Sequence, residues 1–391
     1  MSLELPARVL VLGLARSGQA ATAALERRGV QVVAAGSELG NDEDLSLLDG
    51  VGLLVKSPGV PGENALVAGA RERGIPVWSE VELGYRLLPG ARLVGVTGTN
   101  GKTTTVELLG AIFREAGRDV AVAGNVGRAL SGIEPAEWVV CELSSFQLED
   151  VHELACEIAV LLNLEPDHLN RHGSFEAYRD AKLRIFERAG TAIVPRGLGL
   201  RGIEFSADDP LPAEPLMRGA HNRENAAAAT AAARVAGIED EAIATALTAF
   251  PGVEHRLELV AEVGGVRYVN DSKATNVAAA VWALAAYADS PVYLIVGGQG
   301  KGESFASLAA AIGPNVLGVY AIGERAGELA AAIGAGVTEA GDLATAVELA
   351  AHRAAPGEVV LLSPACTSYD QFENFERRGE EFRRLVQNLT E

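Results

Sequence analysis

Short apolar runs alternate along the chain with segments whose apolar residues recur at helical spacing. Many runs end in glycine, proline or small polar residues, as buried strands do where they turn toward a helix. Strands that alternate with helices in this way are typical of parallel α/β sheets. The runs predict strands at 9–12, 30–34, 53–56, 93–96, 138–142, 158–162, 266–270, 292–296, 316–322 and 359–363. Helical spacing is clearest at 81–88, 106–113, 175–188 and 226–236.

The chain has 391 residues, which is more than one ordinary hydrophobic core accommodates. Pro-Gly pairs at 89–90 and 251–252 interrupt the strand and helix pattern. We therefore expect an α/β protein of three domains. The expected domains are an N-terminal Rossmann-like domain (1–90), a central P-loop ATPase-like domain with a mostly parallel sheet (91–252) and a C-terminal Rossmann-like domain (253–391).

The strand at 93–96 leads into a glycine loop, Thr97-Gly98-Thr99-Asn100-Gly101-Lys102-Thr103-Thr104, and then into a helix. The glycines let backbone N–H groups turn toward a phosphate, while Lys102 suits its outer oxygens and the Thr103 hydroxyl suits Mg²⁺. The strict P-loop pattern has glycine where this chain has Val96. An ordinary loop that contains a Gly-Lys pair is the alternative. Because strand and helix lie where the mechanism needs them, we expect a nucleoside triphosphate site.

Two further strands of the expected central domain end in acidic residues. Glu142 closes the strand at 138–142, and Asp167 and His168 follow the strand at 158–162. A buried carboxylate is costly without a metal ion or a cation, so Glu142 is expected to complete the Mg²⁺ shell that Thr103 begins. His168 taken alone could be structural, but beside Asp167 in a domain that needs metal we favour a site role.

Lysine is rare: only five of the 33 basic residues are lysine. A lysine retained among so many arginines is expected where a guanidinium cannot substitute. Lys102, Lys182, Lys273 and Lys301 all lie in motifs of interest, although a lysine on a helix such as Lys182 is usually a solvated one. Chance survival on the surface is the alternative, and it fits Lys56 best.

Residues 9–18 resemble a dinucleotide-binding turn in which Ala15 replaces the second glycine. The acid that such a site needs for ribose is missing after the strand at 30–34, because residues 35–37 are Ala-Gly-Ser. This argues against a complete NAD site and for another phosphate-bearing ligand. The segment 57–59 ends the next strand and should line the same pocket, because ligands bind at the carboxyl ends of parallel strands.

Polar clusters mark the remainder of the chain. Asn222 and Asn225 lie at i and i+3 at the start of an alanine-rich helix, where they could cap the helix or contact an adenine edge. The strand at 266–270 leads into Asn270-Asp271-Ser272-Lys273-Ala274-Thr275-Asn276. The strand at 292–296 leads into glycines and Lys301. These strand ends indicate a second ligand-binding domain without a P-loop.

The net charge of −19 argues against nucleic acid or an anionic membrane as a partner. We expect no signal peptide and no membrane-spanning helix. The three cysteines form no Cys-x-x-Cys pair, which indicates a reducing compartment, so we expect a cytoplasmic protein.

The motifs at 97–104, 142–148, 270–276 and 363–366 together resemble those of the Mur ligases, the cytoplasmic enzymes that build the peptidoglycan stem peptide. Residues 147–149, Asp271 and the segment 368–379 are most similar to the members that add D-glutamate. The resemblance covers essentially the whole chain. The segment 195–219 is shorter than in the family, which should trim the edge of the central sheet.

The resemblance implies an ATP-dependent ligase that joins D-glutamate to UDP-N-acetylmuramoyl-L-alanine through an acyl phosphate. It implies two Mg²⁺ ions, a CO₂-derived carbamate on Lys182, a monomer, and closure of the third domain to complete the site. The implied catalytic residues are Lys102, Glu142, His168, Lys182, Asp271 and Lys273, with metal held by Thr103, Glu142, His168 and carbamylated Lys182. ATP would contact Gly98, Thr99, Asn100, Gly101, Lys102, Thr103, Thr104, Asn222, Asn225, Arg256 and Asp271. The UDP substrate would contact Leu14, Ala15, Arg16, Ser17, Ser57, Pro58, Gly59, Asn125 and Ser144, and the amino acid Lys273, Thr275, Lys301, Ser368 and Phe375.

Other functions fit the sequence less well. A P-loop kinase or plain ATPase leaves the third domain and its lysines without a role. An oxidoreductase needs the missing acid, and a simple binding module has no use for Glu142, His168 and Lys182 together. Within the family, alanine-adding enzymes prefer His where Asn100 stands, diaminopimelate-adding enzymes carry an Asp-Asn-Pro-Arg motif that we do not find, and folylpolyglutamate synthase lacks the first domain.

Overall fold

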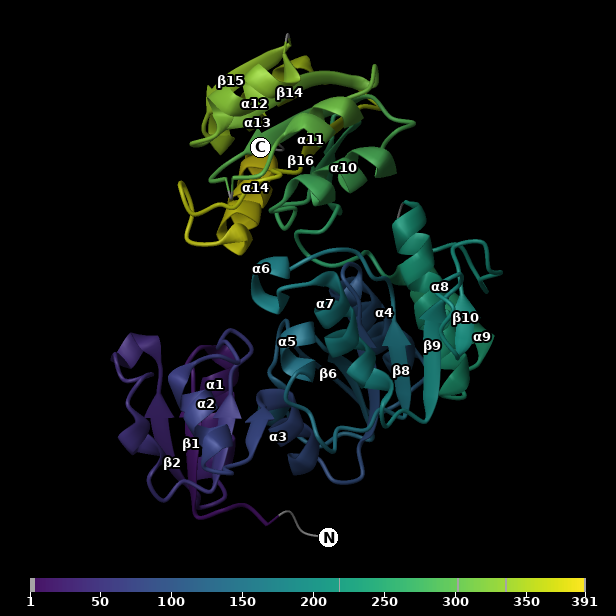
Figure 1. Cartoon of the computed structure of the whole chain (residues 1–391). Helices are drawn as coiled ribbons and strands as arrows, with labels where there is room; N and C mark the ends of the chain where they lie inside the picture. Colours follow the sequence, from purple (N-terminus) through teal and green to yellow (C-terminus); the bar gives the residue numbers. More distant parts are fainter. Residues whose placement is uncertain (1–3, 218, 301, 335, 390–391) are drawn as a thin grey trace. The chain divides into compact units, whose positions relative to one another are not determined.

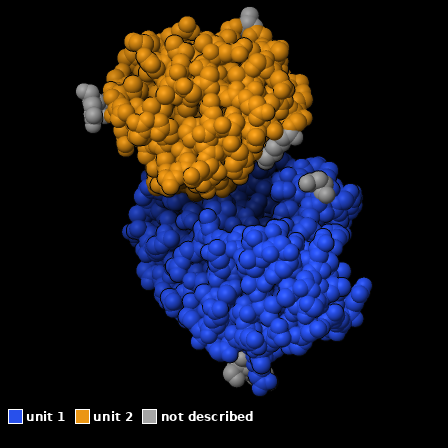
Figure 2. Space-filling view, turned by 90° about the vertical axis from the view of Figure 1, so that its left-hand side faces the viewer, with its two compact units in different colours: residues 1–215, 221–250 blue, residues 216–220, 251–391 orange. Residues whose placement is uncertain are grey.

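The structure is a computed structural model that describes residues 4–217, 219–300, 302–334 and 336–389 (Figure 1). The chain forms three sheets with helices around them, which confirms the expected α/β class. It divides into two compact units, one of residues up to 215 together with 221–250, the other of 216–220 together with the chain from 251 onward (Figure 2). The first unit contains two of the sheets and the second unit contains the third. The three-domain division stays a prediction.

The first sheet is fully parallel, with strand order β2-β1-β3-β4. Its central strands consist mostly of buried aliphatic residues, as expected for strands covered on both faces. The strands are β1 (Arg8–Leu12), β2 (Gln31–Ala35), β3 (Leu53–Lys56) and β4 (Val77–Ser79). The helices are α1 (Arg16–Glu26), α2 (Ala65–Glu72) and α3 (Glu80–Leu87).

The second sheet is also parallel, with order β10-β9-β8-β5-β7-β6. β5 lies between β7 and β8, so the loop after β5 starts in the middle of the sheet edge. The strands are β5 (Arg92–Thr97), β6 (Val120–Gly124), β7 (Trp138–Glu142), β8 (Ile158–Leu161), β9 (Thr191–Pro195) and β10 (Ile203–Phe205). The helices are α4 (Lys102–Glu115), α5 (Ser145–Leu148), α6 (Leu169–His172), α7 (Phe175–Leu183), α8 (Ala220–Val235) and α9 (Asp240–Ala249).

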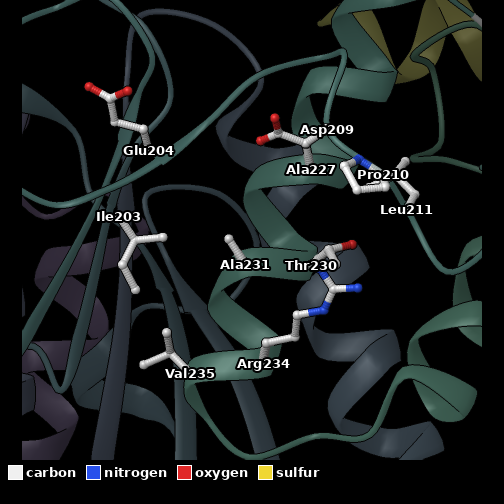
Figure 3. A pocket seen from close by; sticks show the side chains of 10 residues that line it. All are labelled: Ile203, Glu204, Asp209, Pro210, Leu211, Ala227, Thr230, Ala231, Arg234 and Val235. Carbon is white, nitrogen blue, oxygen red and sulfur yellow. The ribbon is translucent and has the colours of Figure 1, made fainter.

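The short segment 195–219 lies at the β10 edge of this sheet. There a groove of about 400 Å³ opens between β10, the loop at 209–211 and α8 (Figure 3). Residues of α8 such as Ala227, Thr230 and Arg234 line one side, and Ile203 lines the other. None of the site residues expected from the sequence lines this groove.

The third sheet has order β11-β12-β16-β13-β14-β15 and is parallel except for β11, which runs antiparallel to β12. Its carboxyl edge carries the polar strand ends expected from the sequence. The strands are β11 (Glu258–Val263), β12 (Val266–Asn270), β13 (Val292–Gly297), β14 (Val316–Ile322), β15 (Val337–Gly341) and β16 (Val359–Leu362). The helices are α10 (Val277–Ala286), α11 (Ala306–Ala311), α12 (Ala326–Ile333), α13 (Leu343–Arg353) and α14 (Phe375–Asn388).

Buried charges join the first two sheets. Lys56, at the end of β3, is 1% exposed, and its Nζ lies 2.7 Å from Asp150 and 3.3 Å from Glu149. The interpretation of Lys56 as a surface lysine is therefore wrong. Two carboxylates of helix α3 also connect the first sheet to the second. Glu82 accepts the N–H groups of residues 152–154, and Glu80 accepts the N–H of Ser131 at 2.6 Å. These contacts explain why both sheets belong to one compact unit.

Candidate active site

The loop after β5 has the backbone geometry of a phosphate cradle. Gly101 has a φ of 82° and a Cβ there would lie 2.2 Å from the Asn225 side chain, so only glycine fits. The helix α4 begins at Lys102, whose Nζ donates to the carbonyls of Gly98 at 2.9 Å and Thr99 at 2.8 Å. The Lys102 side chain thus lies over the same loop that would bind a phosphate.

A buried carboxylate faces the start of α4. The Thr103 hydroxyl donates to one oxygen of Glu142 at 2.9 Å, and the Asn125 amide donates to the other at 3.1 Å. Glu142 is 2% exposed and ends β7 beside β5 and β6. The sheet therefore brings together Thr103 and Glu142, the pair expected to hold Mg²⁺, and adds Asn125.

Lys182 is buried beside the phosphate loop, unlike a typical solvated helix lysine. It is 2% exposed, and its Nζ donates to the Gly98 carbonyl at 2.6 Å. Burial, together with the nearby positive charge of Lys102, lowers the pKa of Lys182 to about 6. The neighbouring Tyr178 hydroxyl lies 3.0 Å from the Thr99 hydroxyl, which links α7 to the loop.

His168 occupies the N-cap of α6, with a positive φ of 52°. Its ring packs against Phe146 with centroids 5.0 Å apart, and its Nε2 lies 3.5 Å from Asp167. About half of the side chain is exposed. The histidine is thus on the same sheet edge as Glu142 and accessible to a ligand.

A second histidine of α6, His172, was not expected to matter. Its Nε2 lies 3.0 Å from the Ser145 hydroxyl, its Nδ1 lies 3.6 Å from Glu149, and its ring stacks on Phe146. Burial lowers its pKa. Nothing in the residue pattern distinguished His172 from an ordinary helix residue.

Asparagines surround the loop. Asn222 and Asn225 are both buried at the start of α8, and the Asn225 amide donates to the Asn222 side chain at 3.4 Å. Asn225 touches Gly101, so the pair lies beside the phosphate loop. On the other side of the loop, the Asn100 N–H donates to the Asn163 side chain at 2.8 Å. Asn163 was not predicted as a site residue. Thr104 is buried within α4.

The glycine turn after β1 lies against the end of β3. The Ser57 hydroxyl donates to the Gly13 carbonyl at 2.7 Å, and Arg16 donates to the Gly127 carbonyl at 3.1 Å. Thus the segments Leu14–Ser17 and Ser57–Gly59 are neighbours, as expected, and Pro58 lies within the second segment. On the α5 side, Ser144 caps its helix through a reciprocal pair with Gln147.

An acidic residue follows the segment 35–37 after β2. Glu38 lies in a short 3₁₀ turn three residues beyond β2, and its carboxylate accepts the Leu14 N–H at 2.7 Å. Its own backbone N–H and that of Leu14 lower the pKa of Glu38. Residues 35–37 contain no acid, as the sequence indicated, but the turn that follows brings Glu38 to the glycine loop.

In the second unit, Asp271 directly follows β12 and is buried. Its carboxylate accepts the Ser363 hydroxyl at 2.8 Å and the Leu257 N–H at 3.3 Å. Burial raises the pKa of Asp271 to about 7. Arg256 lies in the turn just before Leu257, so the chain brings it near the same strand end.

Two of the expected amino-acid residues, Lys273 and Phe375, are in contact. The Nζ of Lys273 lies 4.3 Å from the Phe375 ring centroid, and the Ser272 hydroxyl donates to the Phe375 carbonyl at 2.8 Å. Thr275 lines a small hollow that does not include Phe375, and Ser368 is buried. Lys301 lies outside the described residues.

Arg378 joins several strand ends of the second unit to α14 and was not expected as a site residue. It is 1% exposed and donates to the carbonyls of Ser272 at 2.8 Å, Cys366 at 3.1 Å and Thr367 at 3.2 Å. One side chain thus connects the ends of β12 and β16 to α14. Its place inside the motif at 368–379 was the only signal in the sequence.

The chain matches two protein-family models. Residues 96–197 match the Mur ligase middle domain, and residues 255–366 match the Mur ligase, glutamate ligase domain. UDP-N-acetylmuramoylalanine--D-glutamate ligase from Anaeromyxobacter dehalogenans is 42% identical over 97% of both chains. The protein of the same name from Myxococcus xanthus is 40% identical over 98% of both. The chain belongs to the Mur ligase family.

Solved Mur ligases and a related synthase share its fold. UDP-N-acetylmuramate-alanine ligase from Thermotoga maritima matches with a TM-score of 0.64 at 17% identity, covering 97% of this chain and 99% of that one. Folylpolyglutamate synthase/dihydrofolate synthase from Yersinia pestis matches with a TM-score of 0.59 at 20% identity, over 78% and 92%. These likenesses concern the fold alone.

The donor set of this Mur ligase fits Mg²⁺ bound together with a nucleotide. Within the described residues no group of three or more His, Cys, Asp and Glu side chains could enclose a metal ion. A buried carboxylate that accepts a threonine hydroxyl is instead an oxygen site that leaves room for phosphate and water ligands, as Mg²⁺ prefers. No described helix is long and apolar enough to cross a bilayer.

Proposed function

We propose that this Mur ligase joins D-glutamate to UDP-N-acetylmuramoyl-L-alanine and converts ATP to ADP and phosphate, a step of peptidoglycan precursor synthesis. The observation that carries the proposal is the full-length identity of about 40% to ligases that bear this name. The buried Thr103–Glu142 pair and the phosphate loop supply the chemistry that such a reaction requires.

A carboxylate does not react with an amine at neutral pH, because oxide is too poor a leaving group. In the proposed reaction a carboxylate oxygen of the substrate attacks the γ-phosphorus, and the bond to the β-phosphate oxygen breaks to release ADP. The amine nitrogen of D-glutamate then attacks the acyl carbon of the acyl phosphate. Phosphate leaves with the bonding electrons, and the amine loses a proton.

The phosphate loop would hold ATP through backbone N–H groups of residues 98–104 and the positive end of α4. Lys102 would exchange the Gly98 and Thr99 carbonyls for the outer phosphates. Asn222 and Asn225 would contact adenine. Arg256 and Asp271 are proposed to act on the γ-phosphate and ribose.

Thr103 and Glu142 would hold one Mg²⁺, and His168 with carbamylated Lys182 would hold a second. Bound Mg²⁺ offsets the negative charge that develops on the phosphate oxygens. The Asn125 amide keeps Glu142 in place by donating to its second oxygen. The Thr103 hydroxyl at the start of α4 and the Glu142 carboxylate at the end of β7 are thus already in contact.

The Lys182 carbamate is supported by burial and by the lowered pKa. CO₂ reacts with a neutral amine: nitrogen bonds to the carbon, and one proton leaves. Arginine stays protonated and cannot take this role, which accounts for a lysine at this position.

Residues 14–17 of the glycine turn and residues 57–59 would contact the UDP end of the substrate, and Asn125 would contact the muramoyl part. Ser144 would also contact the UDP substrate. Lys273, Thr275, Lys301, Ser368 and Phe375 would hold D-glutamate, whose two carboxylates need cations and hydroxyl donors. We propose three domains (1–90, 91–252 and 253–391), with closure of the third completing the site, in a monomeric cytoplasmic enzyme.

Phosphate release tests the proposal. The purified protein is supplied with ATP, Mg²⁺ and UDP-N-acetylmuramoyl-L-alanine, and D-glutamate, L-glutamate, L-alanine and meso-diaminopimelate are compared. We expect turnover with D-glutamate only, and a Lys102→Met variant should lose it. Equal turnover with L-glutamate or diaminopimelate would show that the proposed substrate is wrong.

A further inference from the structure

An arginine of the short helix α6 bonds to a loop of the first sheet. The Arg171 guanidinium donates to the carbonyls of Gly59 at 3.4 Å and Val60 at 2.7 Å, in the loop that follows β3. The Arg171 side chain is 15% exposed, so these bonds are largely shielded from water, which strengthens them. Arg171 was not among the residues expected to take part in the site.

The loop that Arg171 holds packs against the glycine turn after β1. A Cβ on Gly13 would lie 2.9 Å from a methyl carbon of Val60 and 3.0 Å from the Ser57 side chain, so the loop and the turn are in close contact. The Val60 N–H also donates to the Ser57 carbonyl at 3.1 Å. Because both segments are proposed to contact the UDP end of the substrate, a shift of the loop would disturb that whole subsite.

The same guanidinium is also held by residues of the second sheet region. Its central carbon lies 4.8 Å from the centroid of the Phe146 ring, and its Nη2 lies 3.5 Å from Glu149. The Phe146 ring in turn packs against His168, and the Arg171 backbone N–H donates to the His168 carbonyl at 2.9 Å. One side chain thus connects the loop at 57–60 with the helical turn that carries the proposed metal ligand.

The terminal nitrogens of Arg171 are directed at protein acceptors. Two adjacent carbonyls and the Glu149 carboxylate receive them, so the guanidinium has little capacity left for a phosphate group. Its planar fork can bond two neighbouring carbonyls at once while its face rests on an aromatic ring, a combination that a lysine ammonium does not match. These contacts indicate a residue that orients other groups and does not itself bind the substrate.

The proposed reaction requires such an orientation. The UDP end of the substrate would lie at the glycine turn and the loop at 57–60, while its carboxylate must meet the γ-phosphate near His168. A misplacement of about 1 Å between reacting atoms is enough to slow a reaction on the order of 100-fold. We propose that Arg171 is a positioning residue that fixes the loop at 57–60 relative to His168 and so delivers the substrate carboxylate to the γ-phosphate, an inference that rests on the proposed function.

Calorimetric binding and steady-state kinetics of Arg171→Met test this role, because methionine keeps an apolar contact with Phe146 but has no donor. We expect the Kd of UDP-N-acetylmuramoyl-L-alanine to rise about 10-fold, as for loss of charge-assisted hydrogen bonds. At saturating substrates kcat should fall about 10- to 100-fold through misplacement of the carboxylate. The Kd of ATP, measured without the UDP substrate, should stay within about threefold of the wild-type value. General damage to the unit would weaken binding of both ligands, so this split separates positioning from a structural defect.

Further variants keep the test decisive. Arg171→Lys keeps the charge but not the fork, so it should recover only part of the loss and leave the Kd of the UDP substrate at least about threefold above wild type. That variant serves as the test if Arg171→Met does not fold. Arg188→Gln is the matched control, because Arg188 is an exposed arginine that pairs with an exposed Glu153, and its Kd values and kcat should equal those of wild type.

Three results overturn the inference, and they differ in scope. If wild type converts the UDP substrate and the Arg171 variants keep its kcat, the positioning role alone is wrong. If Arg171→Met weakens ATP binding as much as UDP-substrate binding, Arg171 only maintains the fold, and the role is again wrong. If wild type shows no turnover of the UDP substrate with D-glutamate, the proposed function and the role of Arg171 fail together.

Discussion

Lys182 gives the sharpest test of the proposed chemistry. Lys182→Arg places a permanent cation where the lysine is mostly neutral, and it removes the amine that would carry the carbamate. With a pKa of about 6, about 97% of the Lys182 side chain is neutral at pH 7.5, whereas an ordinary lysine is about 0.1% neutral. Burial beside Gly98 and Lys102 therefore increases the fraction of neutral, reactive amine on the order of 1000-fold. An arginine, with a pKa above about 12, gains nothing from this environment.

We expect kcat of Lys182→Arg to fall by about 100- to 1000-fold, the range for losing one electrostatic contribution to a transition state. The assay is phosphate release with saturating substrates, with and without added bicarbonate, which should not rescue the variant. Carbon-13 NMR after incubation with labelled bicarbonate should show a carbamate signal in wild type only.

The matched control is Arg179→Lys on the same helix, because Arg179 is exposed and pairs with Asp180. It should retain wild-type activity, and both variants should show cooperative thermal unfolding. Full activity of Lys182→Arg, or an unchanged carbamate signal in it, would refute the reasoning.

Three other changes test separate parts of the structure. Glu142→Gln should reduce kcat at least about 100-fold and raise the Mg²⁺ concentration needed for half-maximal rate, measured by Mg²⁺ titration of phosphate release; an unaltered titration would contradict the metal assignment. Lys56→Met should cost about 1–3 kcal/mol of unfolding free energy, measured by urea denaturation, because the buried Asp150 loses one cation and keeps only its pair with Arg71; a cost below about 0.5 kcal/mol would contradict it. Asp271 has a folded pKa raised to about 7, so its contribution to stability is fully present below its unfolded pKa and declines as pH rises toward 7. Asp271→Asn should therefore flatten the fall in thermal midpoint between pH 5 and pH 8, and an unchanged slope would contradict the buried-acid account.

The features that were predicted correctly are local. The strand, glycine loop and helix at 93–113 lie next to one another in the chain, and the strands at the centre of each sheet are continuous apolar runs. Strands at sheet edges were missed, as in β10 and β15, because they are short or partly exposed and their apolar pattern is weak. The alanine-rich helix begins at Ala220 rather than at residue 226, since polar residues form its first turns.

The features that were missed depend on contacts between distant residues. Lys56 contacts Asp150 only because two sheets pack together, so the residues next to Lys56 in the sequence did not indicate that it is buried. Glu38 reaches Leu14 through a short 3₁₀ turn that apolar periodicity does not reveal. In the sequence, His172 and Arg378 resemble ordinary helix residues. Only the fold brings Ser145 next to His172 and three backbone carbonyls next to Arg378.

The central claim is that ATP energises the substrate carboxyl group as an acyl phosphate. Transfer of oxygen tests it most directly: UDP-N-acetylmuramoyl-L-alanine labelled with ¹⁸O in its carboxylate is converted with ATP and D-glutamate, and the released phosphate is analysed by mass spectrometry. The account predicts one ¹⁸O atom in each phosphate, formed in step with amide product. Unlabelled phosphate alongside amide product would contradict it.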